Sequence, residues 1–449
     1  MCSGSGACPS VVPWCAKRAS WVAWLIALCQ FATGSIYKHE LIDGEVHEIS
    51  CESLDDCYLK GVSTPGMLLH RSWATEINWA MERRASRIAG LNASALFSRQ
   101  VQVRELFRRL FKAEFPRGIP NARQIRRYED EERGVSVTML LFESWPGHSV
   151  PAVLFTPLGA ESGTQKLPGV LHIPGHLAPG LRDPAEQRLS LGLAQRGYAV
   201  LTFDPISQGE RQVYPEELGL ECHINRGEAG DVCKSAGPPC STAHDHLGKQ
   251  LWLMGHSAAE LFLQDAQRAL DFLAGLPWVD ASRIGAIGCS GGGMLTAYLA
   301  AVDERVRAAA IACYFSTLSQ ELEKGTCNYD AEQIIWGQAR LGLDKPDLLA
   351  ARAPRPTVVL LTSHDCFPIS GGQEGWHEAT PFFAAHGPNE LGEYGIGVSE
   401  TAGFHGVTDM GLDIVYSIFG DYLEPPPLVH PPKDTSPLPC ERLWFRESP

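Results

Sequence analysis

The pattern of apolar and polar positions divides the chain into regions. Between residues 35 and 130, apolar residues recur at helical spacing among charged ones, as in 71–87 and 101–115. This pattern predicts an N-terminal helical extension. From 131 to 423, short apolar runs alternate with amphipathic stretches, as expected for one α/β domain. Residues 424–449 are rich in proline and are predicted to be irregular.

The central region predicts a mostly parallel sheet with helices on both faces, an α/β fold. The turn Trp145-Pro146-Gly147 joins the first two strands, and the Gly-, Pro- and Cys-rich segment 211–250 is predicted to be an insertion near the top of the sheet. The predicted strands are 135–143, 151–156, 169–173, 198–204, 283–288, 306–312 and 357–362. The predicted helices are 185–196, 258–274, 294–301 and 409–422.

The most informative motif is Gly288-Cys289-Ser290-Gly291-Gly292, which lies between a predicted strand and a predicted helix. The pattern G-x-S-x-G in this position is the nucleophile elbow of α/β-hydrolases. The serine sits at a tight turn, and the flanking glycines remove side chains that would collide with the strand and the helix. In a chain with 44 glycines the motif alone is weak, so its value depends on the rest of the chain.

An acid and a base follow the serine in the order that α/β-hydrolases use. Asp365 comes directly after the strand 357–362, where catalytic groups collect in open α/β sheets. The alternative is a turn-forming aspartate before a proline. His405, just before the last predicted helix, is the best candidate for the base. The competing histidines are His364, His377 and His386.

An oxyanion hole needs two backbone N–H groups near the serine. We expect one from Gly291 and one from Gly175 or His176, in the loop after the strand 169–173. His172 is expected to hold this loop in place. Asp204, after the strand 198–204, is expected to brace loops near the site rather than to act as the acid.

Together with these motifs, residues from about 151 to 423 resemble the acetyl xylan esterase-like and dienelactone hydrolase-like α/β-hydrolases. The matching segments are 174–176, 204–211, 265–271, 277–280, 288–293, 303–305, 365–368 and 405–406. The resemblance implies an α/β-hydrolase fold with Ser290 as nucleophile, Asp365 as acid and His405 as base. Two features of the sequence depart from these families. Cys289 directly precedes the serine, and Ser290 stands where the dienelactone hydrolases proper use a cysteine as nucleophile.

Net charge and composition limit the classes of molecule that the protein is expected to bind. The net charge of −14 and the absence of a basic run argue against nucleic acid. We expect no cofactor and no metal, and a small-molecule or carbohydrate ester as substrate. Cys222, Cys233 and Cys240 lie near His223 and His244, but without a C-x-x-C pair they indicate zinc only weakly.

The N-terminus has the pattern of a signal peptide. Lys17-Arg18 precede a short apolar run, 21–32, and then small residues. Residues 1–34 are therefore predicted to be a signal peptide of a secreted protein, with an uncleaved anchor or a buried helix of a cytosolic protein as alternatives. The ten cysteines that follow are compatible with disulfides. The three at core or active-site positions are expected to be free thiols: Cys289, Cys313 and Cys366.

The function predicted from the sequence is a serine esterase that forms an acyl-enzyme, with carbohydrate acyl esters as a candidate substrate class. One alternative is a serine peptidase of the prolyl-oligopeptidase type. Such enzymes carry a β-propeller, and the region before residue 131 is too short to form one, which argues against this alternative. Another is a non-catalytic binding member of the fold. The sequence leaves the oligomeric state open.

Overall fold

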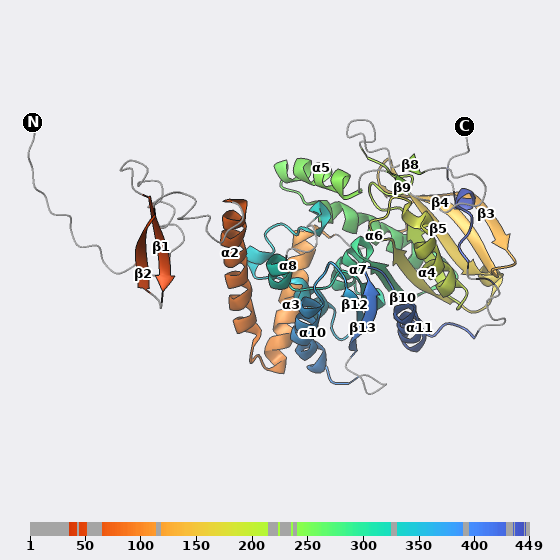
Figure 1. The fold of residues 1–449 in the computed structure, drawn as a ribbon. Coiled ribbons are helices and arrows are strands. Elements are labelled where there is room, and N and C mark those ends of the chain that lie inside the picture. The colour runs from red at the N-terminus through yellow and green to blue at the C-terminus, as the bar shows by residue number, and fades with distance from the viewer. Residues whose placement is uncertain are drawn as a thin grey trace, which may run out of the picture. The chain divides into compact units, whose positions relative to one another are not determined.

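The computed structural model describes the backbone of residues 36–42, 45–51, 65–113, 118–213, 223–224, 235–236, 240–324, 330–388, 395–427, 434, 436–443 and 445, with most side chains from residue 74 onward. The chain divides into two compact units, Met1–Glu76 and Ile77–Pro449 (Figure 1). In the first unit, strands β1 (Ile36–Ile42) and β2 (Glu45–Cys51) form an antiparallel hairpin. The signal peptide predicted at 1–34 lies outside the described residues.

The second unit is built on a nine-stranded sheet with the order β13-β12-β11-β10-β6-β7-β5-β4-β3. Its six strands from β13 to β7 run parallel, and β5, β4 and β3 are added antiparallel. The strands are β3 (Ala122–Asp130), β4 (Val135–Trp145), β5 (His148–Pro157), β6 (Leu167–Ile173), β7 (Ala199–Phe203), β10 (Val279–Cys289), β11 (Val306–Ala312), β12 (Thr357–His364) and β13 (Ile396–Phe404). The mostly parallel sheet is confirmed.

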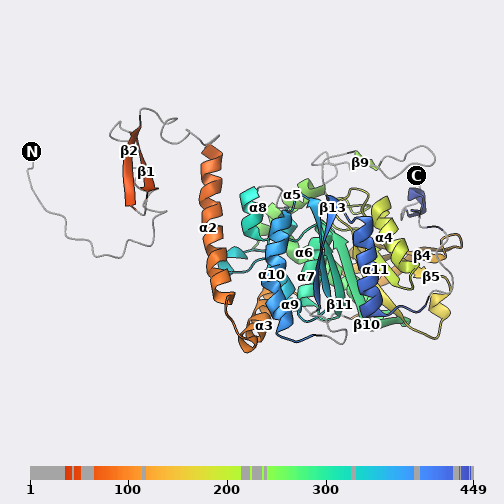
Figure 2. The same cartoon turned by 60° about the horizontal axis from the view of Figure 1, so that its bottom comes forward.

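Helices cover both faces of this sheet, as expected (Figures 1 and 2). Helices α4 (Pro184–Ala194) and α11 (Asp409–Leu423) pack in one apolar core, against residues such as Val200 and Ile287. Helices α3 (Ala93–Leu110), α6 (Ala258–Gly275), α7 (Gly291–Val302), α9 (Lys345–Arg352) and α10 (Ile369–Ala384) pack in the other. Helices α2 (Pro65–Ile88), α5 (Cys240–Leu253) and α8 (Leu318–Lys324) and the two-residue strands β8 (His223–Ile224) and β9 (Ser235–Ala236) complete the described α-helices and strands.

The sequence pattern of the central strands follows from this sandwich. Every residue of β6 and β7 is buried, because helices cover these parallel strands on both sides. Helix α6 carries an apolar stripe, and a capping box of Ser257 and Glu260 fixes its first turn.

The expectation that residues 35–130 form a helical extension is only partly right. Helices α2 and α3 lie in this stretch, but 36–51 form the β1–β2 hairpin, and β3 is the edge strand of the central sheet. Strand β3 is mostly exposed and carries arginines and acidic residues. Edge strands are commonly charged, so β3 lacks the apolar alternation that marks an inner strand.

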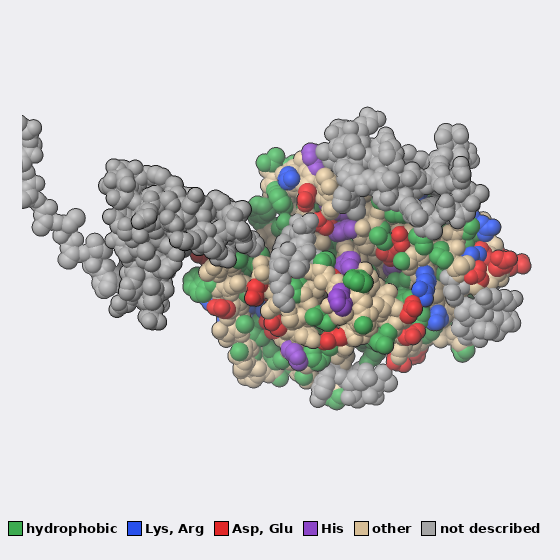
Figure 3. Space-filling model, viewed as in Figure 1, with side chains coloured by type: hydrophobic (Ala, Val, Ile, Leu, Met, Phe, Trp, Pro, Cys, Tyr) green, Lys and Arg blue, Asp and Glu red, His purple; other side chains and the backbone are tan. Residues whose placement is uncertain are grey.

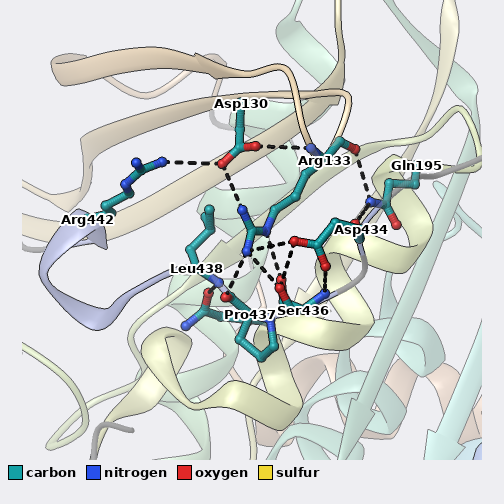
Figure 4. A network of polar contacts seen from close by, with 9 residues as sticks. Asp130, Arg133, Gln195, Asp434, Ser436, Pro437, Leu438 and Arg442 are labelled. Carbon is teal, nitrogen blue, oxygen red and sulfur yellow. Dashed lines mark hydrogen bonds and ion pairs between the residues drawn. The ribbon is translucent and has the colours of Figure 1, made fainter. Parts of the chain in front are cut away.

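The described part of the C-terminal tail packs on the sheet edge and on α4 (Figure 4). Arg133, in the turn after β3, donates to the carbonyl of Ser436 at 2.8 Å and forms an ion pair with Asp434 at 3.2 Å. The N–H of Leu438 donates to Gln187 of α4 at 2.9 Å, and the Leu438 side chain is buried. The described residues of the predicted irregular tail therefore have fixed contacts, and they include a short 3-10 helix, Cys440–Leu443.

Two of the three cysteine predictions are confirmed. Cys289 and Cys313 are free thiols. The prediction for Cys366 is wrong, because Cys366 is disulfide-bonded. This residue lies on a partly exposed loop after β12 and not in the core, which explains why the packing argument failed there. Among the described residues, no helix is long and apolar enough to span a membrane.

Candidate active site

Ser290 lies at a sharp turn between β10 and α7. Its backbone has φ 60° and ψ −123°, and residues other than glycine rarely adopt such a positive φ. Such strain costs about 1–3 kcal/mol and persists only where surrounding packing enforces it. Here the Ser290 N–H donates to the carbonyl of Ala312 on β11 at 3.0 Å. A Cβ on Gly292 would overlap the carbonyl oxygen of Ile173, so only glycine allows the turn to approach β6 this closely.

Helix α7 begins at Gly291, three residues earlier than predicted. As the first residue of the helix, Gly291 has no intrahelical partner for its N–H. This N–H is therefore available beside the serine, which is the property that an oxyanion donor needs.

Asp365 and His405 meet at the carboxyl ends of two adjacent strands. Strand β12 ends at His364 and β13 ends at Phe404, and these strands are parallel neighbours. The residue that follows each strand therefore reaches the same edge of the sheet. Nδ1 of His405 lies 2.7 Å from Oδ1 of Asp365.

The surroundings of Asp365 favour its ionised form. Burial raises the pKa of this carboxyl, but its hydrogen bond and charge interaction with His405 outweigh burial, and the net pKa is below the usual range. Further donors are the N–H of Phe367 at 3.0 Å and the hydroxyl of Thr362 at 3.1 Å. The Asp365 side chain is 3% exposed, whereas that of His405 is 36% exposed.

The competing histidines have other neighbours. Nδ1 of His364 lies 2.8 Å from the hydroxyl of Ser363, the His377 ring packs beside Trp376, and Nε2 of His386 lies 3.0 Å from the side-chain oxygen of Gln100. Among the described histidines, only His405 contacts Asp365.

Ser290, His405 and the loop after β6 line one cavity of about 300 Å³. Figure 3 shows histidine side chains near the middle of the face it displays, flanked by apolar and acidic ones. The cavity lining comprises Gly175, His176, Leu177, Asp183, Ala185, Glu186, Arg188, Leu189, Cys289, Ser290, His405, Gly406, Val407 and Leu412. Asp365 lies behind His405, outside this lining. The structure thus brings together the predicted nucleophile, base and oxyanion loop.

The oxyanion loop offers one of its two candidate donors. The Gly175 N–H already donates to Oε1 of Glu186 at 2.9 Å, so it cannot also donate into the cavity while that bond is kept. The His176 N–H donates no hydrogen bond within the described residues. Gly291 and His176 are therefore the donors that the geometry leaves.

Glu186, on the first turn of α4, is a residue that the sequence reasoning missed. Its Oε1 holds Gly175, and its Oε2 lies 2.8 Å from Nε2 of His172. His172 is fully buried, and its Nδ1 lies 2.7 Å from the hydroxyl of Ser190, which agrees with the expected structural role. Nothing in the sequence pattern pairs residue 186 with the loop.

A second histidine–carboxylate cluster borders the same cavity. Nε2 of His176 lies 2.6 Å from Oε1 of Glu332, and Nδ1 of His176 lies 3.2 Å from Oδ2 of Asp330. Nδ1 of His244, on α5, lies 3.1 Å from the same Glu332 oxygen. Glu332 belongs to a 3-10 helix, Ala331–Gln333, and like His244 it is fully buried. We call these four residues the His176–Glu332 cluster.

Charge interactions dominate this cluster. Burial lowers the pKa of His176, but Glu332 and Asp330 outweigh it and raise that pKa to about 10. Burial raises the pKa of Glu332, but the two histidines hold it well below the usual range. The sequence reasoning noted His244 only as a neighbour of cysteines, and it gave no signal for Asp330 or Glu332, which are far from the elbow along the chain.

Asp204 braces the loops beside the site, as expected. It accepts from the N–H groups of Leu181 and Glu210, both at 2.9 Å. Burial raises the pKa of its carboxyl to about 6, although neighbouring donors and Arg182 oppose this.

The sheet order, the strained serine turn and the cavity at the carboxyl ends of the strands define an α/β-hydrolase. Residues 115–326 match the model of the acetyl xylan esterase family (AXE1). The protein is thus an α/β-hydrolase that resembles the acetyl xylan esterases, and it is a carboxylic ester hydrolase.

Individual relatives agree with this class. The chain is 25% identical over 300 residues to "Putative hydrolase YtaP" of Bacillus subtilis (strain 168), a match that covers 63% of this chain and 87% of that protein. Among solved structures, the methylesterase BT1017 superposes with a TM-score of 0.58 at 19% identity, over 82% of this chain and 73% of that one. A glucuronoyl esterase from Solibacter usitatus gives 0.50 at 15% identity, over 70% and 91%. At these identities the solved structures show the fold.

Proposed function

We propose that the protein is a serine esterase in which Ser290 is the nucleophile, His405 the general base and Asp365 the residue that orients the base. The observation that carries this proposal is the 2.7 Å contact between His405 and Asp365 beside the strained Ser290 turn. A carboxylate that accepts from Nδ1–H of the histidine leaves the Nε2 lone pair to take the serine proton.

The reaction follows from these positions. Ser290 attacks the ester carbonyl while His405 takes its proton, and the negative charge that develops on the carbonyl oxygen is stabilised by the N–H groups of Gly291 and His176. His405 then protonates the leaving alcohol, and the acyl group stays on Ser290. A water molecule, deprotonated by His405, then attacks the acyl carbon. The bond to Oγ of Ser290 breaks, Oγ takes the proton from His405, and the acid is released.

The neighbouring thiol does not compete as nucleophile. A hydrogen bond with Cys313, together with burial, raises the pKa of Cys289 well above its usual value. Because the thiolate is the reactive form of cysteine, Cys289 stays unreactive, and the hydroxyl of Ser290 is the group that attacks.

For the substrate we propose short acyl esters on carbohydrate, acetyl groups in the first place. The match to the acetyl xylan esterase family supports this class. The cavity of about 300 Å³ suits a small acyl group, and its lining combines apolar side chains such as Leu189 and Leu412 with the charged Asp183 and Arg188. We further propose that the protein is secreted through residues 1–34, since carbohydrate polymers are extracellular substrates.

The proposal is tested with Ser290→Ala and a matched control, Ser282→Ala, which removes an exposed hydroxyl from the same strand. Wild-type protein and the control should hydrolyse p-nitrophenyl acetate and react covalently with a fluorophosphonate probe. Ser290→Ala should lose the labelling, and its kcat should fall by about 10⁴-fold or more. Undiminished turnover in a folded Ser290→Ala protein would overturn the nucleophile assignment.

Substrate class is tested by comparing acetylated xylo-oligosaccharides, methyl esters of glucuronic acid and amino-acyl amides. We expect release of acetate from the first substrate to be fastest. Faster methanol release from the second substrate would show that the carbohydrate supplies the acid of the ester and not the alcohol. Faster amide cleavage would favour a peptidase.

A further inference from the structure

Two buried histidines of the His176–Glu332 cluster direct a ring nitrogen at the same carboxylate oxygen of Glu332. Nε2 of His244 lies 2.7 Å from the carbonyl oxygen of Ile206, which can only accept, so Nε2 carries the proton. The neutral ring then presents a lone pair at Nδ1, and this lone pair faces Oε1 of Glu332, another acceptor, at 3.1 Å.

His176 is in the same situation. Its Nδ1 faces the carboxylate of Asp330 and therefore carries a proton, and its Nε2 lies 2.6 Å from the same oxygen of Glu332. The charged ring donates to that oxygen, whereas the neutral ring presents a lone pair to it. His172 provides the contrast, because its Nδ1 partner is the hydroxyl of Ser190, which can donate. Among the described residues, only in this cluster do two imidazole nitrogens converge on one carboxylate oxygen.

Burial makes this convergence costly unless a cation lies between the groups. The side chains of His244 and Glu332 are 0% exposed, and that of His176 is 15% exposed. Nε2 of His176, Nδ1 of His244 and both carboxylate oxygens of Glu332 are buried without a hydrogen bond of acceptable geometry, although both nitrogens lie within hydrogen-bond distance of Oε1 of Glu332. Two imidazolium rings with centroids 5.2 Å apart would repel each other in this interior.

We propose that His176, His244 and Glu332 bind a divalent transition metal ion, with zinc as the best match. Two imidazole nitrogens and one carboxylate are a common zinc ligand set, and their three donor atoms lie within 4.8 Å of one another. Ligand atoms around a tetrahedral zinc ion are about 3.3 Å apart. The 3.1 Å separation of His244 and Glu332 is near this value, and the 2.6 Å separation of His176 and Glu332 is shorter.

The second layer of contacts is also that of a metal site. Ligating histidines almost always donate their other ring N–H to a carbonyl or a carboxylate, as His244 does to Ile206 and His176 to Asp330. The turn that carries Glu332 is held in turn by Asp245 of α5, which accepts from the Ala331 N–H at 3.0 Å. Each proposed ligand is thus held by a further hydrogen bond or ion pair: His244 by Ile206, His176 by Asp330, and the turn of Glu332 by Asp245.

The site adjoins the esterase cavity. A Cβ on Gly291 would overlap Nε2 of His176, so this ligand packs directly on the serine turn. A metal ion bound here would fix His176, whose backbone N–H is the proposed oxyanion donor. That consequence rests on the proposed function, whereas metal binding itself does not. The site departs from the sequence-based expectation of no metal.

Metal content is measured on tag-free full-length protein, because a histidine tag would itself bind zinc. After growth with zinc and dialysis, we expect about one zinc per chain by elemental analysis. Protein stripped with a chelator and titrated with Co²⁺ should develop the visible absorption of four-coordinate cobalt, and zinc should restore the melting temperature that stripping lowers.

Glu332→Gln and His244→Ala should each lose the bound zinc and the cobalt absorption, while the control His386→Ala, which alters a histidine outside the cluster, should keep both. His176→Gln provides a milder variant for the case in which the others fail to fold. Wild-type protein that holds less than a tenth of an equivalent of zinc and gives no cobalt absorption would overturn the proposal. So would full zinc retention by a folded Glu332→Gln protein.

Discussion

Two histidine–carboxylate pairs border the same cavity, and they differ in what faces each ring nitrogen. His405 contacts Asp365 through Nδ1, and no described group bonds to its Nε2. His176 has a carboxylate at both nitrogens and is less exposed. A general base needs one nitrogen held and one free, so the first pair suits proton transfer. The second pair has no lone pair to offer the serine, whether His176 is protonated or bound to a metal.

The largest expected effect is that of His405→Ala. Without the base, kcat for p-nitrophenyl acetate should fall by about 10⁴-fold or more. His176→Gln should lower kcat by only about 10- to 100-fold, through displacement of the loop that carries its backbone N–H. His377→Ala serves as the control and should match wild type. Equal losses in the first two variants would remove the distinction between the pairs.

Asp365→Asn should rank next, with a loss of up to about 10⁴-fold in kcat, since an amide can stabilise the wrong tautomer of His405. Glu332→Gln should cost less, because Glu332 touches no reacting atom. Steady-state kinetics with the same ester make this comparison. A greater loss of kcat in Glu332→Gln than in Asp365→Asn would contradict it.

The lowered pKa of Asp365 also predicts a pH dependence of stability. A carboxyl whose folded-state pKa is depressed stabilises the fold above its unfolded pKa, about 3.9, and this contribution is lost as the pH falls through the folded value. The difference in free energy of unfolding between wild type and Asp365→Asn should therefore be largest near neutral pH. Urea denaturation at steps from pH 7 down to about pH 2 measures it, and a difference that grows as the pH falls through the folded pKa would have the wrong sign.

Glu186→Ala tests the support of the loop that carries His176. Loss of this side chain removes the acceptor for the Gly175 N–H and a partner of buried His172. We expect kcat to fall by about 10- to 100-fold with little change in KM, because the oxyanion loop is displaced by a small distance. Glu161→Ala, which removes a more exposed carboxylate, is the control. A rise in KM alone would assign Glu186 to substrate binding.

The smallest effect on activity should come from a charge network remote from the cavity. Arg133→Ala breaks the contacts between the β3–β4 turn and the C-terminal tail, and should lower the free energy of unfolding by about 1–3 kcal/mol while leaving kcat unchanged. Arg127→Ala, at a more exposed ion pair, should cost less than about 1 kcal/mol. Denaturant unfolding and ester turnover report the two quantities. A loss of kcat in Arg133→Ala would show that pocket geometry depends on the tail.

The sequence by itself determined the elements that local pattern and chain order control. Buried parallel strands read as apolar runs, and the residue after such a strand necessarily reaches the edge of the sheet where ligands bind. Ser290, Asp365 and His405 could therefore be placed near one another without coordinates. The edge strand β3 escaped because charged edge strands carry no apolar alternation.

Only the tertiary structure decided which polar groups already have a hydrogen-bond partner and which groups from distant parts of the chain lie side by side. The Gly175 N–H is occupied by Glu186, from a different element, so the candidate oxyanion donor moved to His176. His244 and Glu332 are separated by almost ninety residues, yet Nδ1 of His244 lies 3.1 Å from a buried carboxylate oxygen of Glu332. Such contacts depend on how helices and loops pack across the sheet, and no periodicity or spacing in the chain records them.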